Sequence, residues 1–361
     1  MKNILIVGAG ITGAIFANKL KRVAKVTVID KRPHTAGNIY LDFQDGIKIH
    51  KYGAHIFHTN NEVVWDFFNK YDTNTFVPYI HKVKAFNDGK YYTLPFNLDT
   101  LDEIGLTRFI TPEQGRTYDN LEDYCINTVG YEIYERLIKH YTRKQWGMNP
   151  CELPASIIKR IPIRNDRDDR YFTDKYQGLF DYNVIINNLL NGVEVKLGVD
   201  FFSNRDDFEA NYDLIIYTGA IDRLCDYKFG HLNWRCLRFE NETVGVEQFQ
   251  ALPVINYPTE RDYWTRIIEH KNFPHYKYTL PYTIISKEYT EAYSKDNIPD
   301  YPVNTDEDRS KFLKYSKYAK ESLPKYILCG RLADYVYVDM HQAAAKAIEK
   351  AENIYNNLIN L

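Results

Sequence analysis

Residues 4–14 read ILIVGAGITGA, a short β-branched run that passes directly into glycines with the spacing G-x-G-x-x-G. Apolar residues then recur at helical intervals up to Leu20, and a second β-branched run at 26–29 ends at Asp30. In a dinucleotide-binding β-α-β unit, such glycines allow a tight turn, close approach of the backbone to a pyrophosphate and close helix packing. The helix N-terminus supplies amide donors for the phosphates, and the carboxylate can accept the ribose hydroxyls. The stretch therefore predicts a dinucleotide site that contains Gly8, Gly10, Thr12, Gly13 and Asp30.

The residues that follow Asp30 indicate which dinucleotide binds. Residues 31–38, KRPHTAGN, are similar to the R-x-x-x-x-G-G-N stretch of FAD-binding oxidoreductases of the glutathione-reductase type, with Ala36 in place of the first glycine. Residues 330–332 follow a late β-branched run, as a segment does that returns to the flavin in such proteins. An ordinary strand-loop-helix connection is the alternative for this late segment. Both stretches favour FAD over NAD, and they add Lys31, Gly37, Asn38 and Arg331 to the expected cofactor site.

The chain length and charge balance exclude several classes of protein. With 361 residues, two or three packed units are expected rather than one core. The 46 basic and 48 acidic residues give a net charge of −2, so no general field attracts nucleic acid or an anionic membrane. No apolar run is long enough for a signal segment or a membrane span, and we therefore expect a cytoplasmic protein. Five scattered cysteines without a C-x-x-C pair indicate buried thiols rather than a disulfide framework or a zinc site.

Hydrophobic periodicity predicts the remaining elements. An amphipathic helix with an asparagine cap is expected at 61–72, and a hairpin in 79–94 that turns at 87–89. Apolar residues at three- and four-residue intervals predict a helical region over 100–160, followed by a charged, mobile loop at 164–170. Further strands are expected at 193–197, 214–219, 326–330 and between 234 and 290, and a final helix at 339–360.

These elements predict an α/β fold, a Rossmann-like FAD-binding domain with an inserted helical subdomain and an antiparallel β-sheet domain. The FAD-binding domain is expected to comprise residues 1–76, 200–235 and 318–361. Residues 98–195 are expected to form a mainly helical substrate subdomain, with the mobile loop near 160–171. The β-sheet substrate domain is expected to take residues 77–97 and 236–317.

Four further segments carry a resemblance to one family. They are HKYGAHIFHT at 50–59, YTRKQWG at 141–147 with LPASIIKRIP at 153–162, WTRIIEHK at 264–271 and GRLADYVYVDM at 330–340. With the glycine motifs they extend over nearly the whole chain, and they resemble the UDP-galactopyranose mutases. The resemblance implies an isomerase in which N5 of reduced FAD attacks the anomeric carbon of a nucleotide-bound sugar. The nucleoside diphosphate leaves, the ring opens through an iminium, and it recloses with the other ring size. UDP-galactopyranose, converted to UDP-galactofuranose for cell-surface polysaccharide synthesis, is the substrate that the resemblance implies.

The resemblance also assigns site residues. Arg160 and Arg266 match the two arginines that hold the leaving diphosphate, and a guanidinium is suited to this because its forked donors bind phosphate oxygens without titrating. A solvated surface charge is the alternative for either arginine. His58 is expected against the isoalloxazine as a third catalytic residue, and His55 and Met340 complete the cofactor site. The implied substrate-binding residues are Tyr141, Trp146, Tyr171, Tyr301, Tyr337, Asp339 and His81.

Several alternatives stay open from the residues themselves. The tyrosines and Trp146 could be packing residues, and Asp339 could be a simple helix cap. His55 and His58 are not expected to bind a metal, because no H-E-x-x-H pattern surrounds them and no carboxylate follows nearby. His81 and Trp264 depart from the galactose enzymes, so UDP-N-acetylgalactosamine or dTDP-fucose could undergo the same chemistry.

Two other classes of protein would share parts of the pattern. An FAD-dependent oxidoreductase of the amine-oxidase type would have the same glycine motif, and a non-catalytic protein could bind the nucleotide-sugar or the flavin without turnover. For the mutase, the expected partners are the nucleotide-sugar, a reductant such as NAD(P)H that primes the flavin, and a second copy in a homodimer. Neither nucleic acid nor a membrane is expected as a partner.

Overall fold

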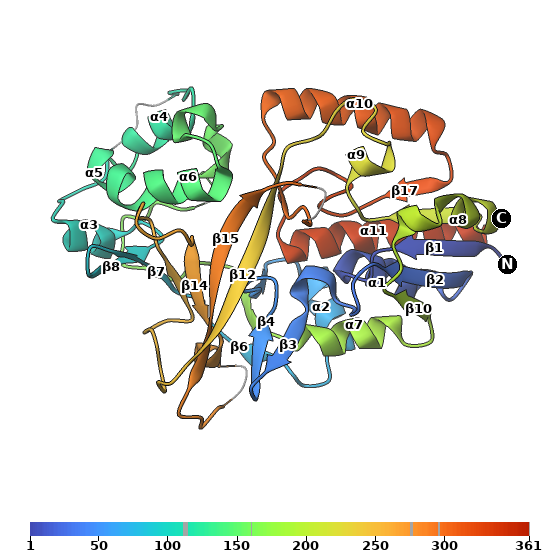
Figure 1. Ribbon diagram of the computed structural model, residues 1–361, viewed down its shortest axis with the longest axis horizontal. Coiled ribbons are helices and arrows are strands. Elements are labelled where there is room, and N and C mark those ends of the chain that lie inside the picture. Colours follow the sequence, from blue (N-terminus) through green and yellow to red (C-terminus); the bar gives the residue numbers. More distant parts are fainter. Residues whose placement is uncertain (111–114, 160, 275–276, 295–296, 361) are drawn as a thin grey trace.

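The computed structural model describes residues 1–110, 115–159, 161–274, 277–294 and 297–360. Figure 1 shows two lobes. The lobe on the right holds both chain ends and a parallel sheet, and the lobe on the left holds short helices between residues 98 and 146. The long strands of a second sheet run between and below the two lobes.

The first sheet is the parallel sheet expected from the N-terminal sequence. In spatial order, its strands are β10 (Glu194–Leu197), β2 (Lys25–Asp30), β1 (Asn3–Val7), β11 (Leu214–Tyr217) and β17 (Tyr326–Leu328). All neighbours are parallel, and Ile4 lies opposite both Val26 and Leu214. The continuous β-branched runs suit this sheet, because helices bury both faces of a parallel sheet. The predicted strand-glycine-helix-strand unit is thereby confirmed.

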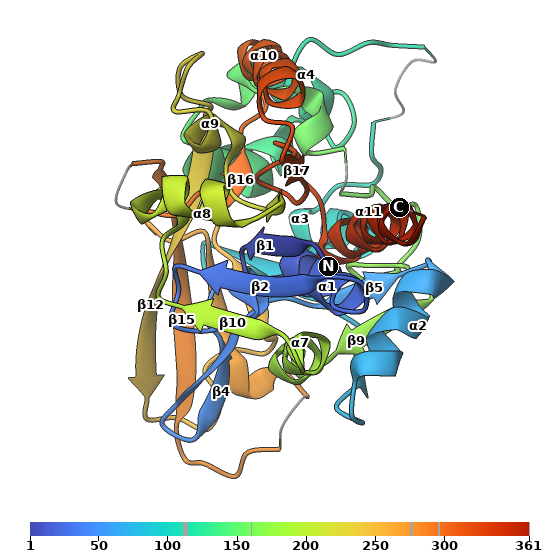
Figure 2. The ribbon, with the colours of Figure 1, turned by 90° about the vertical axis from the view of Figure 1, so that its right-hand side faces the viewer.

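Helices cover both faces of this sheet (Figure 2). They are α1 (Ile11–Leu20), α7 (Tyr182–Leu190) and α11 (Met340–Ile359) on one side, and α8 (Arg205–Asn211) and α9 (Ile221–Leu224) on the other. Phe16, Ile186 and Ala347 share one core with the strands, and Leu5 and Phe201 belong to the core on the opposite face. Residues 182–197 therefore pack with this sheet, although the sequence suggested a helical subdomain that extends to residue 195.

The second sheet has seven strands and joins distant parts of the chain. In spatial order they are β16 (Tyr301–Pro302), β12 (Trp234–Val244), β15 (Thr283–Ala292), β14 (Arg266–Glu269), β13 (Val254–Asn256), β7 (Val83–Asn87) and β8 (Lys90–Leu94). All neighbours are antiparallel except β13 and β7. The predicted hairpin is confirmed: Asp88 and Gly89 at its tip have φ angles of 48° and 78°, as a two-residue turn of a twisted hairpin requires.

Two small sheets and further helices complete the fold. β3 (Leu41–Gln44) pairs with β4 (Ile47–His50), and β9 (Tyr176–Leu179) pairs with both β5 (Phe57–Thr59) and β6 (Val77–Pro78). The predicted capped helix is α2 (Glu62–Tyr71), where the Asn61 side chain accepts from the amides of Val63 and Val64. α10 (Asp306–Ser322) begins with a capping box of Thr305 and Asp308. Single 3₁₀ turns occur at Gly37–Ile39, Pro150–Glu152, Ala155–Ile157, Phe201–Ser203 and His270–Asn272.

The predicted helical region is a group of short helices. They are α3 (Leu98–Ile104), α4 (Leu121–Ile126), α5 (Tyr131–Ile133), a π-helical segment (Tyr134–Lys139) and α6 (His140–Trp146). Leu121, Ile133 and Leu137 share one core with Val83 and Tyr92 of the seven-stranded sheet. The helical lobe is therefore packed on that sheet rather than built around a core of its own.

The charged stretch at 164–170 forms neither helix nor strand. The Arg164 guanidinium donates to the carbonyl oxygens of Asp168 and Arg170 at 2.8 and 2.6 Å. Arg167 forms ion pairs with Asp99 and Asp102 of α3. These contacts attach the stretch to the helical lobe in this conformation, and its mobility stays a prediction.

Two expectations about the whole chain can be compared with the structure. All five thiols are free, and four are buried as predicted, but Cys151 is exposed because it lies in a short surface turn. No helix in the described part of the chain is both long and apolar enough to cross a membrane.

His270 links the small sheet of β3 and β4 to the seven-stranded sheet. Its Nδ1 accepts from the His50 amide at 3.2 Å, and its Nε2 lies 2.7 Å from Ser286 Oγ. The Ser286 hydroxyl itself donates to Asn241, so it must accept from His270 Nε2. The imidazole is therefore held neutral, and burial lowers the pKa of His270 to about 3.

We expect this histidine to make the fold sensitive to acid. The unfolded chain takes up a proton at His270 as the pH falls below about 6.5, whereas the folded chain does so only near pH 3. The contribution of neutral His270 to the free energy of unfolding is thus fully present above pH 6.5 and decreases as the pH falls below it. In His270→Gln, the slope of the free energy of unfolding against pH between 4 and 6 should decrease by about 1.4 kcal/mol per pH unit. Urea titrations measure this slope, with His231→Gln at an exposed position as the control. An unchanged slope in His270→Gln would contradict the expectation.

Candidate active site

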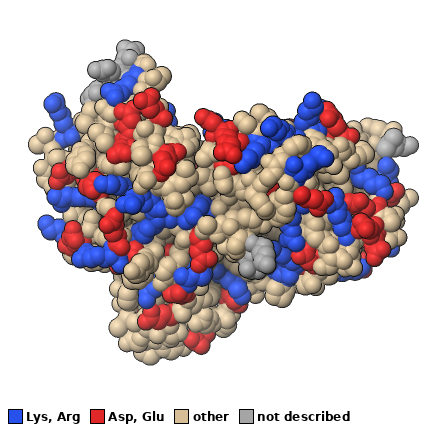
Figure 3. Space-filling model, turned by 45° about the horizontal axis from the view of Figure 1, so that its top comes forward, with Lys and Arg blue, Asp and Glu red and all other residues tan. Residues whose placement is uncertain are grey.

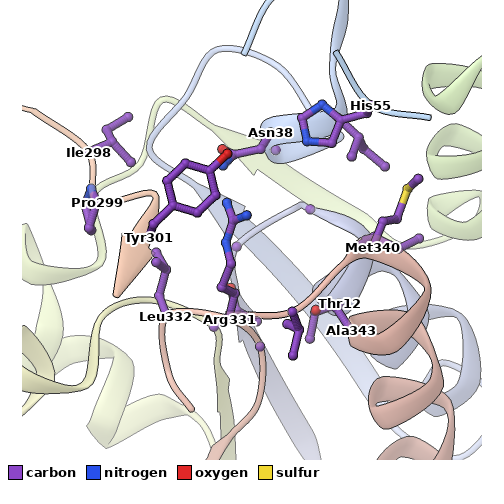
Figure 4. A pocket seen from close by; sticks show the side chains of 18 of the residues that line it. Thr12, Asn38, His55, Ile298, Pro299, Tyr301, Arg331, Leu332, Met340 and Ala343 are labelled. Atoms are coloured by element: carbon purple, nitrogen blue, oxygen red, sulfur yellow. The ribbon is translucent and has the colours of Figure 1, made fainter. Parts of the chain in front are cut away.

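One large pocket, of about 580 Å³, runs along the carboxyl ends of the parallel strands and reaches the seven-stranded sheet and α6. Ligands of open α/β sheets bind at this edge of the sheet. Figure 3 shows a hollow between the two lobes, on a face where basic and acidic side chains are interspersed. Figure 4 shows a part of the pocket wall, where Arg331 points toward Tyr301 and Asn38.

The glycines after β1 leave room that no other residue would leave. Gly8 has a φ of 110°, and a Cβ on Gly13 would lie 1.9 Å from the carbonyl oxygen of Gly8. A Cβ on Gly37 would come within 3.0 Å of the Gly10 Cα, so two glycine loops approach each other face to face. The cradle that the sequence predicts for a pyrophosphate is therefore formed, and it fits a dinucleotide.

All eleven predicted cofactor residues line this pocket. They are Gly8, Gly10, Thr12, Gly13, Asp30, Lys31, Gly37, Asn38, His55, Arg331 and Met340. Asp30 accepts from the amides of Ala9 and Arg32, both at 2.8 Å, one with each carboxylate oxygen. Each oxygen keeps a lone pair, so the carboxylate can join the two loops and still accept a ribose hydroxyl. Contact of these residues with a cofactor stays a prediction.

Asp300, which the sequence analysis missed, organises the middle of the pocket. Its carboxylate accepts from the Asn38 side chain at 2.9 Å and from the Leu237 amide at 2.8 Å. Burial raises the pKa of Asp300, and the Arg331 guanidinium, 4.0 Å away, opposes that rise. Arg331 also lies over the Tyr301 ring, 5.1 Å from its centre. Asn38 from the first lobe is thus held by a carboxylate next to the second sheet.

The two histidines of the HIFH loop have different surroundings. Burial lowers the pKa of His55 to about 4, and its Nδ1 lies 2.8 Å from the Gly53 carbonyl. The His58 ring is buried and stacks on Phe172 with the ring centres 3.7 Å apart. Its Nδ1 lies 2.8 Å from Asp174, a residue that the sequence analysis did not single out. His55 is therefore a neutral wall residue, whereas His58 belongs to an oriented histidine–carboxylate pair.

The sequence analysis considered only carboxylates that follow His58 nearby in the chain, and the fold brings two distant ones, Asp174 and Asp339, to it. Nitrogen and oxygen atoms of His58, Asp339 and His341 lie within 4.8 Å of one another. The two imidazoles, however, meet edge to face at an angle of 70°. The proximity of these groups does not by itself identify a metal site, and the absence of a metal stays a prediction.

Arg266 lies at the other end of the pocket. Its Nε is 2.9 Å from Glu288 Oε1, and its Nη2 donates to the Tyr141 hydroxyl at 3.1 Å. Glu288 is the direct register partner of Arg266 on β15 and also accepts from Thr265. Arg266 is therefore fixed and has guanidinium donors directed toward the tyrosine wall. The second predicted arginine, Arg160, lies outside the described residues.

The predicted aromatic residues gather around Arg266. Tyr301 and Tyr337 stack with ring centres 5.2 Å apart. Tyr141, Tyr171, Tyr301, Tyr337, Asp339 and His81 line the main pocket, whereas Trp146 lines an adjoining cavity of about 70 Å³ next to Tyr141. Burial lowers the pKa of His81 to about 3, which keeps its imidazole neutral. Trp264 faces neither cavity, because it packs between Tyr257 and Tyr289.

Asp339 is both a helix cap and a pocket residue. It is the N-cap of α11, where its amide donates to Gln342 Oε1 at 2.9 Å. Its carboxylate lies 3.9 Å from His58 Nε2. The two interpretations that the sequence left open for Asp339 are therefore compatible.

Sequence reasoning missed the residues at the far end of the pocket. Arg223 donates to Asp200 at 3.2 Å and lies over the Phe202 ring. Burial, and then the nearby Arg223, lower the pKa of Lys31. Asp200, Phe202 and Arg223 follow β10 and β11 in the chain and carry no motif. Only the parallel pairing of those strands with β2 and β1, which the sequence analysis did not predict, could have indicated them.

Comparisons with known proteins agree with this geometry. A sequence model of the UDP-galactopyranose mutase family matches residues 136–337, and one of NAD(P)-binding Rossmann-like domains matches residues 6–71. The chain is 36% identical to dTDP-fucopyranose mutase of Escherichia coli, over 99% of both chains. It is 32% identical to UDP-galactopyranose mutase of Mycoplasma genitalium, over 98% of this chain and 94% of that protein.

The fold is also that of a solved member of this group. A crystal structure of reduced UDP-galactopyranose mutase aligns with a TM-score of 0.77 at 13% identity, over 99% of this chain and 94% of that one. The family model covers more than half of the chain, and the relatives match it over nearly its whole length. The chain therefore belongs to the UDP-galactopyranose mutase family.

Proposed function

We propose that this chain is a flavin-dependent mutase that interconverts the pyranose and furanose forms of a nucleotide-bound sugar. The proposed cofactor is FAD, active in its reduced form. One observation carries the proposal: Arg266, half-buried and fixed by Glu288, faces a wall of tyrosines in the same pocket as the glycine cradle. An oxidoreductase of the amine-oxidase type would share the cradle but has no need of this anion-binding end.

When bound, reduced FAD supplies the nucleophilic N5 that the family reaction needs, and the glycine cradle with Asn38 and Arg331 would hold it. The protein must in turn hold the leaving diphosphate. Arg266 suits this task because Glu288 and Tyr141 orient its guanidinium before any ligand enters. Donors that need no reorganisation stabilise negative charge as it develops on the leaving group.

His58 is proposed to hold or move a proton at its Nε2. The Asp174 carboxylate accepts from Nδ1, which leaves the free lone pair on Nε2. Opening and reclosing a sugar ring requires that a hydroxyl lose and regain a proton, and an imidazole is suited to that exchange. Stacking on Phe172 keeps the His58 ring in one orientation for it.

The proposed substrate is UDP-galactopyranose, with UDP-N-acetylgalactosamine and dTDP-fucose as alternatives for the same chemistry. The identity of 36% with a dTDP-fucopyranose mutase supports keeping the last of these open. The neutral His81 on the pocket wall is where this chain departs from the galactose enzymes. A reductant such as NAD(P)H, a homodimer, a cytoplasmic location and a role in cell-surface polysaccharide synthesis complete the proposal.

The test of this function uses the purified protein with and without dithionite. The visible spectrum should show bound flavin. Incubation with UDP-galactofuranose, UDP-N-acetylgalactosamine and dTDP-fucose, each alone and followed by chromatography of the ring isomers, should give conversion only after reduction. A yellow protein that converts none of the three substrates, or steady consumption of oxygen or NAD(P)H in proportion to product, would favour the oxidoreductase instead.

Arg266 provides a sharper test of the mechanism. Arg266→Lys keeps a positive charge opposite Glu288 but lacks the fork that can hold two phosphate oxygens. Turnover should fall by about a hundredfold or more, whereas the flavin spectrum should be unchanged. Arg160→Ala should lower turnover in the same way.

The control for Arg266→Lys is Arg261→Lys. Arg261 lies in the connection between β13 and β14 that leads to Arg266, and its exposed guanidinium pairs with Asp88 at 3.0 Å. This variant should retain wild-type turnover, because an exposed ion pair contributes little. Near-normal turnover in Arg266→Lys and Arg160→Ala would remove the main support for the proposed mechanism.

A further inference from the structure

Helix α6 and the seven-stranded sheet supply different walls of the pocket at the end that contains Arg266. α6 carries Tyr141 and Trp146, whereas β14 carries Arg266. Tyr141 and Arg266 are 125 residues apart in the chain, yet their hydroxyl and guanidinium groups are within 3.1 Å. The position of the helix against the sheet therefore decides whether this contact forms.

Lys144 binds α6 to the connection between β13 and β14. Its ammonium donates to the carbonyl oxygens of Tyr257, Asp262 and Trp264 at 2.5, 2.8 and 2.7 Å. An ammonium has three donors, and all of them are used here. The connection leads directly into β14, whose first residue is Arg266. Lys144 thus fixes the entry into the strand that carries the phosphate-binding arginine.

Arg235 binds the same helix from β12. Its Nε and Nη2 donate to the carbonyl oxygens of Gln145 and Lys144 at 3.1 and 3.2 Å. These carbonyls belong to the last turn of α6, where no partner exists within the helix and where the helix dipole favours a cation. The Thr290 hydroxyl of β15 also donates to the Lys144 carbonyl. The end of α6 is therefore capped by the sheet itself.

Gly147 makes this approach possible. It ends α6 with a φ of 66°, and a Cβ there would lie 2.7 Å from Arg235 Nη1. The structure thus gives a physical role to three residues of the YTRKQWG segment. Tyr141 faces the pocket, Lys144 binds the β13–β14 connection, and Gly147 admits the guanidinium.

The surroundings of Lys144 and Arg235 indicate that these two cations hold α6 in one position against the sheet. Within the described part of the chain, both side chains donate to backbone carbonyls, and neither forms an ion pair with a carboxylate. Arg235 is buried, and burial lowers its pKa. A buried charge without a counter-ion is unfavourable unless several well-placed acceptors surround it. Such an arrangement stabilises one relative position of helix and sheet.

We propose that Lys144 and Arg235 are positioning residues that clasp α6 to the seven-stranded sheet and thereby hold Tyr141 opposite Arg266 for the nucleotide end of the substrate. The inference rests on the proposed function, because the geometry it explains is that of a nucleotide-sugar pocket. Neither residue lines the pocket, so their effect on the reaction is indirect.

The chain offers a matched control on the same helix. Arg143 precedes Lys144 and also reaches the β13–β14 connection, where it pairs with Glu260 at 3.0 Å. Both of these side chains are largely exposed, and an exposed pair contributes little to structure. Arg143→Met and Lys144→Met therefore remove one cation each from neighbouring positions, with opposite expected results.

The experiment measures the dissociation constant of UDP for the flavin-loaded protein by titration calorimetry. Lys144→Met should raise it about tenfold or more, because small displacements of binding groups are costly, while the flavin content stays that of the wild type. Arg143→Met should stay within about twofold of the wild type. Arg235→Lys, which keeps a charge but cannot reach both carbonyls, should act in the same direction as Lys144→Met.

A double-mutant cycle separates positioning from general stability. If Lys144 acts through the contact of Tyr141 with Arg266, Lys144→Met should have a smaller effect on UDP binding in a Tyr141→Phe background. A lower thermal midpoint with unchanged UDP affinity in both Lys144→Met and Arg235→Lys would overturn the inference, as would strictly additive effects in the cycle. If the wild-type protein itself binds neither UDP nor TDP, the proposed function fails, and this inference fails with it.

Discussion

The buried Glu288 carboxylate needs a positive charge beside it, and the half-buried Arg266 guanidinium supplies that charge. Burial raises the pKa of Glu288, and the Arg266 charge counteracts that rise. The pair exists only because β14 and β15 are adjacent with these two residues in register. Gly53 passes so close that a Cβ there would lie 3.6 Å from Glu288 Oε2. The Arg266–Glu288 pair thus connects the register of β14 and β15 with the loop at Gly53 and with the charge of the pocket.

The pocket requires that two separate folding units present their residues to the same space. The parallel sheet offers a glycine cradle at its carboxyl edge, as any sheet of this type can. What distinguishes this chain is that Asp300, the residue directly before β16, accepts from the Asn38 side chain of the cradle. Arg331 returns from the last parallel strand and lies over Tyr301. The cofactor end and the substrate end are therefore joined by hydrogen bonds and ring contacts rather than by proximity alone.

Local sequence patterns were sufficient for the parts of the fold that depend on neighbouring residues. The glycine cradle, the hairpin at Asp88 and Gly89 and the Asn61 cap each follow from turn or helix chemistry within a few residues. The residues that were missed act through pairings over long distances in the chain. Asp174 reaches His58 across 116 residues, and Asp300 reaches Asn38 across 262. No periodicity or spacing reveals such partners. For the same reason, the sequence placed residues 182–195 in the helical subdomain, whereas they pack with the parallel sheet.

The charge balance of the pocket explains why one arginine is not enough. The diphosphate of a nucleotide-sugar carries about two negative charges, one for each phosphate. Arg266 is already paired with Glu288, and Arg331 lies 4.0 Å from Asp300, so each is partly neutralised before a ligand enters. The neutral tyrosines and His81 can donate hydrogen bonds but add no charge. A further positive charge near Arg266 would therefore favour binding of the diphosphate. Position 160 lies outside the described residues, so the role of Arg160 there stays a proposal that rests on the family motif.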